Sequence, residues 1–366
     1  MIRRLLMASL GLAGVVLLAG AAVCSTSGCS TLGYYAQSVG GHLAIVRSAK
    51  PVATWLADEQ TPAALKERLA LSQRIRDFAV SELKEPDNAS YRRYADLHRP
   101  AAVWNVVAAP ELSLTLQTWC FPVVGCVGYR GYFDKAAADG FAAGLASDAD
   151  GTRPFEVNVY PVPAYSTLGA LPGDWLADPL LSTFINYPEG ELARLIFHEL
   201  AHQVAYAKDD TVFNESFAVT VERIGGARWL AERGSPQARE EYERFDARRE
   251  DFRAITRRYR DALEALYTGP LNDEAKRAGK AELMARLRAD YATLKAERWG
   301  GFSGYDGWFA RANNAAFGVL AAYNQLVPEF ERLFEREGRD FDRFYAEVKR
   351  LAKLPKAERR AALSSP

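Results

Sequence analysis

Five consecutive residues near the middle of the chain have the types and spacing of a hydrolytic metal site. His198-Glu199-Leu200-Ala201-His202 is an H-E-x-x-H motif, and the 366 residues contain only four histidines in total. On a helix, histidines four positions apart lie about 40° from each other on one face, so both can bind one ion. Glu199 lies about 100° from His198, beside such an ion, where a base can take a proton from water. The motif therefore predicts a zinc site with Glu199 as general base.

The third protein ligand is expected on the following helix. Asp209 and Asp210 end the first helix and can cap the second, which places Glu215 near its start. Glu222 lies two turns later on the same face, and two turns rise about 10 Å, so a rigid helix cannot bring both carboxylates to one ion. We expect Glu215 to bind the metal and Glu222 to accept the free N–H of a ligand histidine. The alternative exchanges the two glutamates, because Glu222 is twenty residues past His202, close to thermolysin-like spacing.

The second part of the motif carries a resemblance to a known class of enzymes. The segment Asn214-Glu215-Ser216-Phe217-Ala218-Val219-Thr220-Val221-Glu222 is similar to the N-E-G-F-A-x-x-x-E segment of aminopeptidase N-type zinc peptidases. In those enzymes the first glutamate binds zinc and the later one lies in the outer coordination sphere. The resemblance implies that Glu215 is the ligand and that Glu222 and Asn214 support the site.

A wider resemblance covers nearly the whole mature chain. The chain is similar to a family of bacterial lipoproteins described as predicted aminopeptidases, in Glu191 to Gln203, Ala164 to Gly169, Asn313-Asn314-Ala315 and Tyr323-Asn324. It implies a gluzincin-like zinc metallopeptidase with one Zn(II) ion and a peptide substrate. The gap between His202 and Glu215 is shorter than the eighteen intervening residues of aminopeptidase N, and no G-A-M-E-N segment is present to bind a free amine.

Two other functions remain open alongside a zinc aminopeptidase. One is a zinc endopeptidase, which would not need a site for the free amine of the substrate. The other is a non-catalytic zinc-binding lipoprotein of the envelope. Glu199 argues against the second, because a structural zinc site needs no base and prefers a closed fourth position.

Hydrolysis also needs a hydrogen-bond donor for the developing oxyanion. Tyr305, which follows a glycine-rich loop in the helical half, is the candidate, with Tyr323 and Tyr165 as alternatives. Tyr165, Ser166 and Thr167 lie in a segment that we expect to form an exposed edge strand. Such a strand either pairs with an extended peptide substrate or is an ordinary sheet edge.

The N-terminus predicts a lipoprotein signal peptide over residues 1–28. Two arginines precede an apolar run that ends at Val23, and Thr26-Ser27-Gly28-Cys29 resembles a bacterial lipobox. Cys29 would therefore carry lipid, and Ser30 resembles the sorting pattern for the outer membrane, with the protein facing the periplasm. Lipidation of Cys24 and an uncleaved membrane-spanning anchor are the alternatives.

The two remaining cysteines, Cys120 and Cys126, flank a turn-forming loop. In an oxidising periplasm we expect them to form a disulfide, with two reduced thiols as the alternative. No second pair of soft ligands lies nearby, so a zinc role for this pair is not expected.

Composition and periodicity predict a mostly helical α+β fold. Hydrophobic residues make up 49% of the chain, which is ample for a packed core, and 46 basic residues balance 46 acidic ones, with no basic tail for nucleic acid. Strand patterns lie in the N-terminal half and helical patterns dominate after Glu189. We expect helices over 54–83, 188–207, 237–267 and 273–298, strands within 102–132 and over 155–160 and 180–187, a tether over 29–51, a sheet-containing lobe over 52–207 and a helical lobe over 208–366.

Overall fold

The computed structural model describes residues 29–121, 125–147, 155–164, 166–167 and 174–364, in two compact units, 1–48 and 49–366. Within the first unit, α2 (Cys29–Ser48) is helical, where the sequence predicts a tether. The predicted signal peptide lies outside the described residues. In the described part of the chain, no helix has both the length and the apolar character needed to span a bilayer.

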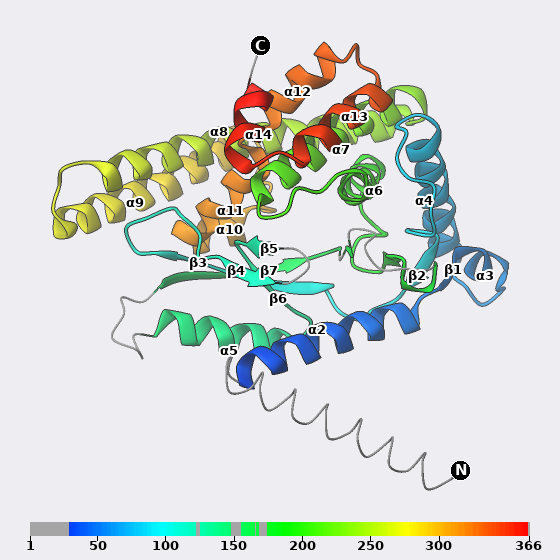
Figure 1. The fold of residues 1–366 in the computed structure, drawn as a ribbon, viewed down its shortest axis with the longest axis horizontal. Coiled ribbons are helices and arrows are strands. Elements are labelled where there is room, and N and C mark those ends of the chain that lie inside the picture. Colours follow the sequence, from blue (N-terminus) through cyan, green and yellow to red (C-terminus); the bar gives the residue numbers. More distant parts are fainter. Residues whose placement is uncertain (1–28, 122–124, 148–154, 165, 168–173, 365–366) are drawn as a thin grey trace, which may run out of the picture. The chain divides into compact units, whose positions relative to one another are not determined.

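In its described residues, the second unit holds three small sheets, all formed by its N-terminal half. The largest has the order β6 (Arg130–Tyr132), β3 (Val103–Pro110), β7 (Phe155–Val162), with antiparallel pairing that runs from Val103↔Val162 to Pro110↔Phe155. α5 and α11 cover its two opposite faces (Figure 1). The others are β1 (Lys50–Pro51), β2 (Arg93–Ala95) and β8 (Leu180–Leu181), and the hairpin of β4 (Trp119–Phe121) with β5 (Gly125–Val127).

Helices make up most of the second unit, so the α+β, mostly helical expectation is confirmed. In chain order they are α3 (Val52–Ala57), α4 (Ala63–Ser81), α5 (Lys135–Ala146), the short 3-10 helix η1 (Asp174–Leu176), α6 (Glu189–Val204), α7 (Thr211–Glu232), α8 (Pro236–Thr268), α9 (Asp273–Glu297), α10 (Asp306–Arg311), α11 (Asn314–Asn324), α12 (Val327–Arg336), α13 (Phe341–Ala352) and α14 (Lys356–Ser364).

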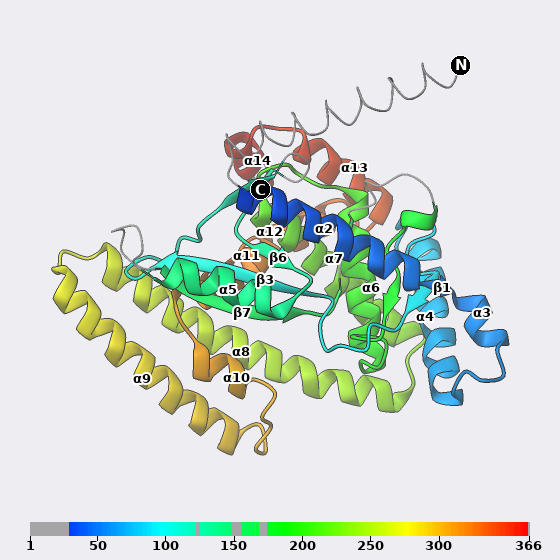
Figure 2. The ribbon, with the colours of Figure 1, turned by 90° about the horizontal axis from the view of Figure 1, so that it is seen from below.

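The two longest helices, α8 and α9, form a hairpin that lies side by side in both views (Figure 1 and Figure 2). Their charged sequences keep one apolar stripe each, and these stripes meet in a buried cluster that includes Leu263 and Leu287. Trp299, Phe309 and Phe317 from the following segments close this cluster. The apolar spacing of the sequence therefore predicts the bounds of both helices to within one residue at each end.

Some predicted elements differ from the structure. The helix expected over 54–83 is two helices, because Pro62 caps α4 in an extended conformation and interrupts the pattern. The strand expected over 180–187 is confined to β8, after which the chain turns toward α6. Ser166 and Thr167 are not in a strand, whereas Tyr165 and 168–173 lie outside the described residues. Among the described residues, the two edge strands of the largest sheet are β6 and β7.

Candidate metal centre

The H-E-x-x-H motif lies on α6, close to the predicted bounds. Pro188 is its N-cap residue, and Glu189 and Glu191 occupy the first turn, where carboxylates interact favourably with the helix dipole. The apolar face, which includes Phe197 and Leu200, is completely buried. This packing fixes the rotation of α6 about its axis, so that both histidines project from the face opposite the apolar one.

The turn between α6 and α7 sets the position of the third residue of the site. Asp209 has a positive φ of 63°, and the Asp210 carboxylate accepts the Phe213 N–H as the N-cap of α7. Asn214 makes two hydrogen bonds to the backbone of Ala207, 2.7 Å from its N and 2.8 Å from its O. Asn214 therefore locks the turn, and in the described part of the chain its side chain has no hydrogen bond to the three converging residues.

His198, His202 and Glu215 converge on one point. The two Nε2 atoms are 3.2 Å apart, and Glu215 Oε2 lies 3.4 Å from Nε2 of His198 and 3.7 Å from Nε2 of His202. Within the described residues these three form the only group of this kind that could hold a metal ion. Their side chains are at most 12% exposed.

This geometry fits a tetrahedral zinc ion. Bonds of about 2.0–2.1 Å to nitrogen and oxygen require ligand atoms about 3.3 Å apart, close to all three observed separations. Burial alone would raise the pKa of Glu215, but the two imidazoles, His202 first, lower it to about 2, so the carboxylate is ionised. Two imidazole nitrogens and one carboxylate are a donor set that zinc accepts.

Glu222 holds His198 from its other side. Its Oε2 is 2.9 Å from His198 Nδ1, so the ring donates Nδ1–H to the carboxylate and keeps its Nε2 lone pair for a metal. The other oxygen accepts a hydrogen bond from the buried guanidinium of Arg194. Burial opposes the charge of Glu222, but Arg194 first and then His198 lower its pKa to about 2. The structure thus brings Glu215, and not Glu222, to the Nε2 atoms.

Arg194 is a site residue that sequence reasoning missed. It lies on α6 one turn before His198, and its side chain is 6% exposed. A Cβ atom at Gly226 would meet Arg194 Cγ at 2.6 Å, so a glycine on α7 makes the space for the guanidinium stem. The same spacing was visible in the sequence: Arg194 precedes His198 by four residues, and Gly226 follows Glu222 by four.

Glu199 interacts electrostatically with both histidines and also with a second set of buried groups. Burial raises the pKa of Glu199, and its charge in turn acts on Tyr91 and Asp178. Asp178 is buried and accepts hydrogen bonds from Thr167 N and the Ser166 hydroxyl. Two residues of the expected edge strand thus contact Asp178, on the side of Glu199.

The structure distinguishes the candidate tyrosines. The Tyr323 ring stacks on His198 with centroids 6.3 Å apart. The pKa of Tyr323 is raised, and the charge of Glu215 is the main cause. Tyr305 instead stacks on Phe252 at 4.4 Å. Among the described residues, no hydrogen bond or ring contact joins Tyr305 to the three converging side chains.

A disulfide hairpin contacts the turn of the site. Cys120 and Cys126 are bonded across β4 and β5. The Cys126 N–H donates to Asp209 Oδ1 at 2.6 Å, and Gly125 has a φ of 77° and no room for a side chain beside Asp209. The hairpin therefore supports the turn that separates His202 from Glu215.

Within the described residues, an α+β fold thus holds a buried His–His–Glu cluster that could bind a metal ion, with a further glutamate adjacent to it in the sequence. A family model described as "Putative aminopeptidase" matches residues 33–363. The chain belongs to this family. No curated protein and no solved structure matches it.

Proposed function

We propose that the protein is a zinc-dependent aminopeptidase of the bacterial cell envelope, with a gluzincin-like site. The family supports a peptidase. The observation that carries the zinc assignment is the set of three buried ligand atoms 3.2, 3.4 and 3.7 Å apart. Burial opposes a charge on His198, but Glu215 and Glu222 raise its pKa, so without a metal ion a second proton on the imidazole would take the place of the cation.

In this proposal one Zn(II) ion is held by His198, His202 and Glu215. When bound, it supplies Lewis-acid activation of a water molecule and of the scissile carbonyl. Glu199 takes the proton of the attacking water and delivers it to the leaving amine. Tyr323, which stacks on His198, is better placed than Tyr305 to donate to the developing oxyanion.

Anchoring is part of the same proposal. Cys29 would be lipidated after removal of residues 1–28, which leaves the body of the protein facing the periplasm at the outer membrane. Incorporation of labelled palmitate into the wild type, and its loss in Cys29→Ser, would support the anchor. Labelling that persists in Cys29→Ser would contradict it.

The zinc assignment is tested by metal analysis of the purified chain. Wild type should carry about one zinc per chain by mass spectrometry, and a His198→Ala/His202→Ala double variant should carry none. Glu199→Gln should keep the zinc and lose about 10²- to 10⁴-fold in kcat on peptides with a free N-terminus. Retention of zinc in the double variant would overturn the site, and efficient cleavage of N-acetylated peptides would identify an endopeptidase.

A further inference from the structure

A cavity of about 300 Å³ adjoins the candidate metal centre. Glu222 and Tyr323, which both contact His198, form part of its wall. Leu195, Val219 and Phe252 give it apolar surface. This volume is at the lower end of the range for ligand pockets, so its occupant is a side chain or a short peptide end.

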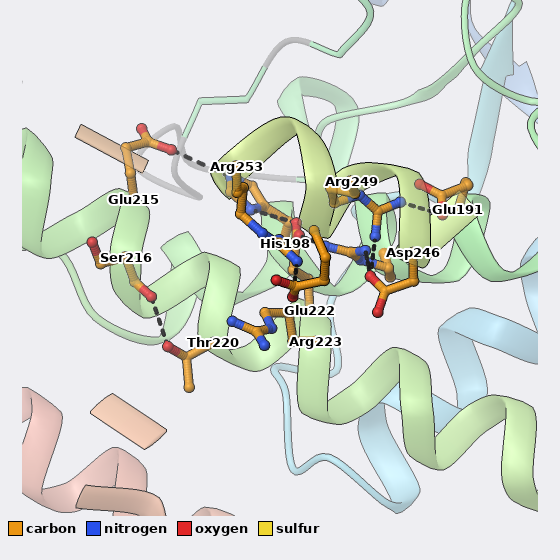
Figure 3. Close-up of polar contacts among 12 residues, drawn as sticks. Glu191, His198, Glu215, Ser216, Thr220, Glu222, Arg223, Asp246, Arg249 and Arg253 are labelled. Atoms are coloured by element: carbon orange, nitrogen blue, oxygen red, sulfur yellow. Dashed lines mark hydrogen bonds and ion pairs between the residues drawn. The ribbon is translucent and has the colours of Figure 1, made fainter. Parts of the chain in front are cut away.

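Two of the three arginines in the wall are neutralised inside the protein. Arg194 pairs with Glu222, and Arg249 donates to Glu191 at 2.6 Å and to Asp246 at 2.9 Å. Figure 3 shows Arg249, Asp246 and Glu191 grouped beside Glu222. Asp246 also lies 3.7 Å from Arg194, so these two arginines are shared among three carboxylates and neither is left to bind a ligand.

Arg253 is the cation that remains. Its side chain is 13% exposed, and among the described residues its one ion pair runs through Nη2 to Glu250, which is 58% exposed. A pair with a solvated carboxylate holds a guanidinium weakly, and no hydrogen bond from Nε or Nη1 of Arg253 is found in the part of the chain that the structure describes.

Tyr305 provides a second donor to the same cavity. Its ring is held by stacking on Phe252, and no hydrogen bond to its hydroxyl is found within the described residues. Burial first, and then the charge of Glu191, raise the pKa of Tyr305, while Arg253 acts on it in the opposite direction. The hydroxyl is therefore a protonated donor near the Arg253 guanidinium.

We propose that this cavity binds a carboxylate of the substrate peptide, held by Arg253 and Tyr305. The inference rests on the proposed function, because the cavity would bind part of the same peptide that the neighbouring site cleaves. A planar guanidinium binds a carboxylate strongly when apolar walls exclude water. The carboxylate is either the C-terminus of a short peptide or an acidic side chain.

Binding of small ligands to the full chain tests this without hydrolysis. N-acetyl-leucine should bind more tightly than N-acetyl-leucinamide if the cavity takes a peptide C-terminus. N-acetylglutamic acid α-amide should bind more tightly than N-acetylglutamine amide if it takes a side chain. Either preference supports the proposal, and calorimetry gives the affinities.

Variants then locate the binding. Arg253→Gln should weaken the preferred carboxylate ligand about ten- to a hundredfold, with partial recovery in Arg253→Lys. Tyr305→Phe keeps the stacking and should weaken binding several-fold. Arg257→Gln, which changes an exposed arginine one turn further along α8, is the matched control and should leave the affinity unchanged.

A carboxylate could also bind directly to zinc, so each titration is repeated after the metal is removed with a chelator. Binding that disappears with the metal and is the same in Arg253→Gln would overturn the inference. Equal affinity for each acid and its amide, or no binding of any ligand, would overturn it too. Failure of the zinc or peptidase assignment would show instead in metal analysis and activity, while the Arg253-dependent preference persisted.

Discussion

At the residue scale, the two histidines of the centre are held unequally. His198 Nδ1 donates to Glu222, which is itself paired with Arg194. His202 Nδ1 is buried and has no hydrogen-bond partner within the described part of the chain. The orientation of the first imidazole therefore depends on Glu222 and Arg194, whereas packing and the contacts of its Nε2 orient the second.

Removal of Arg194 should weaken metal binding although the residue contacts no metal. In Arg194→Gln the buried Glu222 loses its cation, holds His198 less firmly, and zinc affinity should fall about ten- to a hundredfold. Competition with a chromophoric chelator measures this. Arg194→Lys should lose less, and Arg92→Gln, which breaks exposed ion pairs, should lose nothing. An unchanged affinity in Arg194→Gln would show that Glu222 orients the ring alone.

Asp178 should make the stability of the metal-free protein fall as pH rises. Burial raises its pKa to about 6, against 3.8 ordinarily. The folded state therefore binds more protons between about pH 4 and 6, and stability declines across this window by up to about 3 kcal/mol. Asp178→Asn removes this loss. The free energy of unfolding in urea, measured for Asp178→Asn relative to wild type, should be higher at pH 7 than at pH 4. The same difference at both pH values would contradict the assignment.

At the element scale, the centre is an antiparallel helical hairpin of α6 and α7. Glu222 faces His198 and Gly226 faces Arg194, one turn further from the loop on each helix. Gly225 approaches Phe197 so closely that a Cβ atom there would lie 2.9 Å from its ring. The adjacent glycines bring the helices together, and this closeness lets ligand atoms from both helices reach one point.

A methyl group at Gly226 should force this hairpin apart. Arg194 is buried and paired, so its stem cannot move aside cheaply, and Gly226→Ala should destabilise the protein by about 1–3 kcal/mol and lower zinc affinity. Gly140→Ala on α5 is the control, since nothing lies within 4 Å of its added Cβ, and it should be neutral or stabilising by up to about 1 kcal/mol. Denaturant unfolding compares the two. Equal changes in stability in the two variants would show that α6 and α7 shift to accommodate the added methyl group.

At the scale of the whole second unit, segments far apart in sequence converge on the turn between α6 and α7. The disulfide hairpin reaches Asp209, as described above. The C-terminal helix α14 reaches Asp210, whose fully buried carboxylate pairs with Arg359 at 2.8 Å and with Arg360. Arg359 also lies over the Phe213 ring. The N-cap of the helix that carries Glu215 therefore depends on the end of the chain.

Arg359→Leu should test this long-range support. It leaves the buried Asp210 with only one cation, and we expect a loss of about 3 kcal/mol in the free energy of unfolding together with weaker zinc binding. Arg350→Ala breaks an exposed pair with Glu347 and should cost less than about 0.5 kcal/mol. Denaturant unfolding and chelator competition measure both effects. If Arg359→Leu loses stability but binds zinc normally, α14 stabilises the fold without positioning Glu215.

The sequence by itself determined the local features. Motif spacing and apolar periodicity located α6, α7, α8 and α9 and predicted the fold class, because helix geometry depends on residues three or four apart. The choice of Glu215 over Glu222 came from a resemblance, and the structure brings Glu215 to the two imidazoles.

Only the tertiary structure decided what depends on contacts between distant segments. It paired Arg194 with Glu222 and placed Tyr323, rather than Tyr305, against His198. It also placed Tyr305 in the wall of a neighbouring cavity that Arg253 lines as well. The physical reason is that a tyrosine or an arginine has the same sequence signature in a core, on a surface or beside a metal site. Its role follows from the burial and the partners that folding gives it.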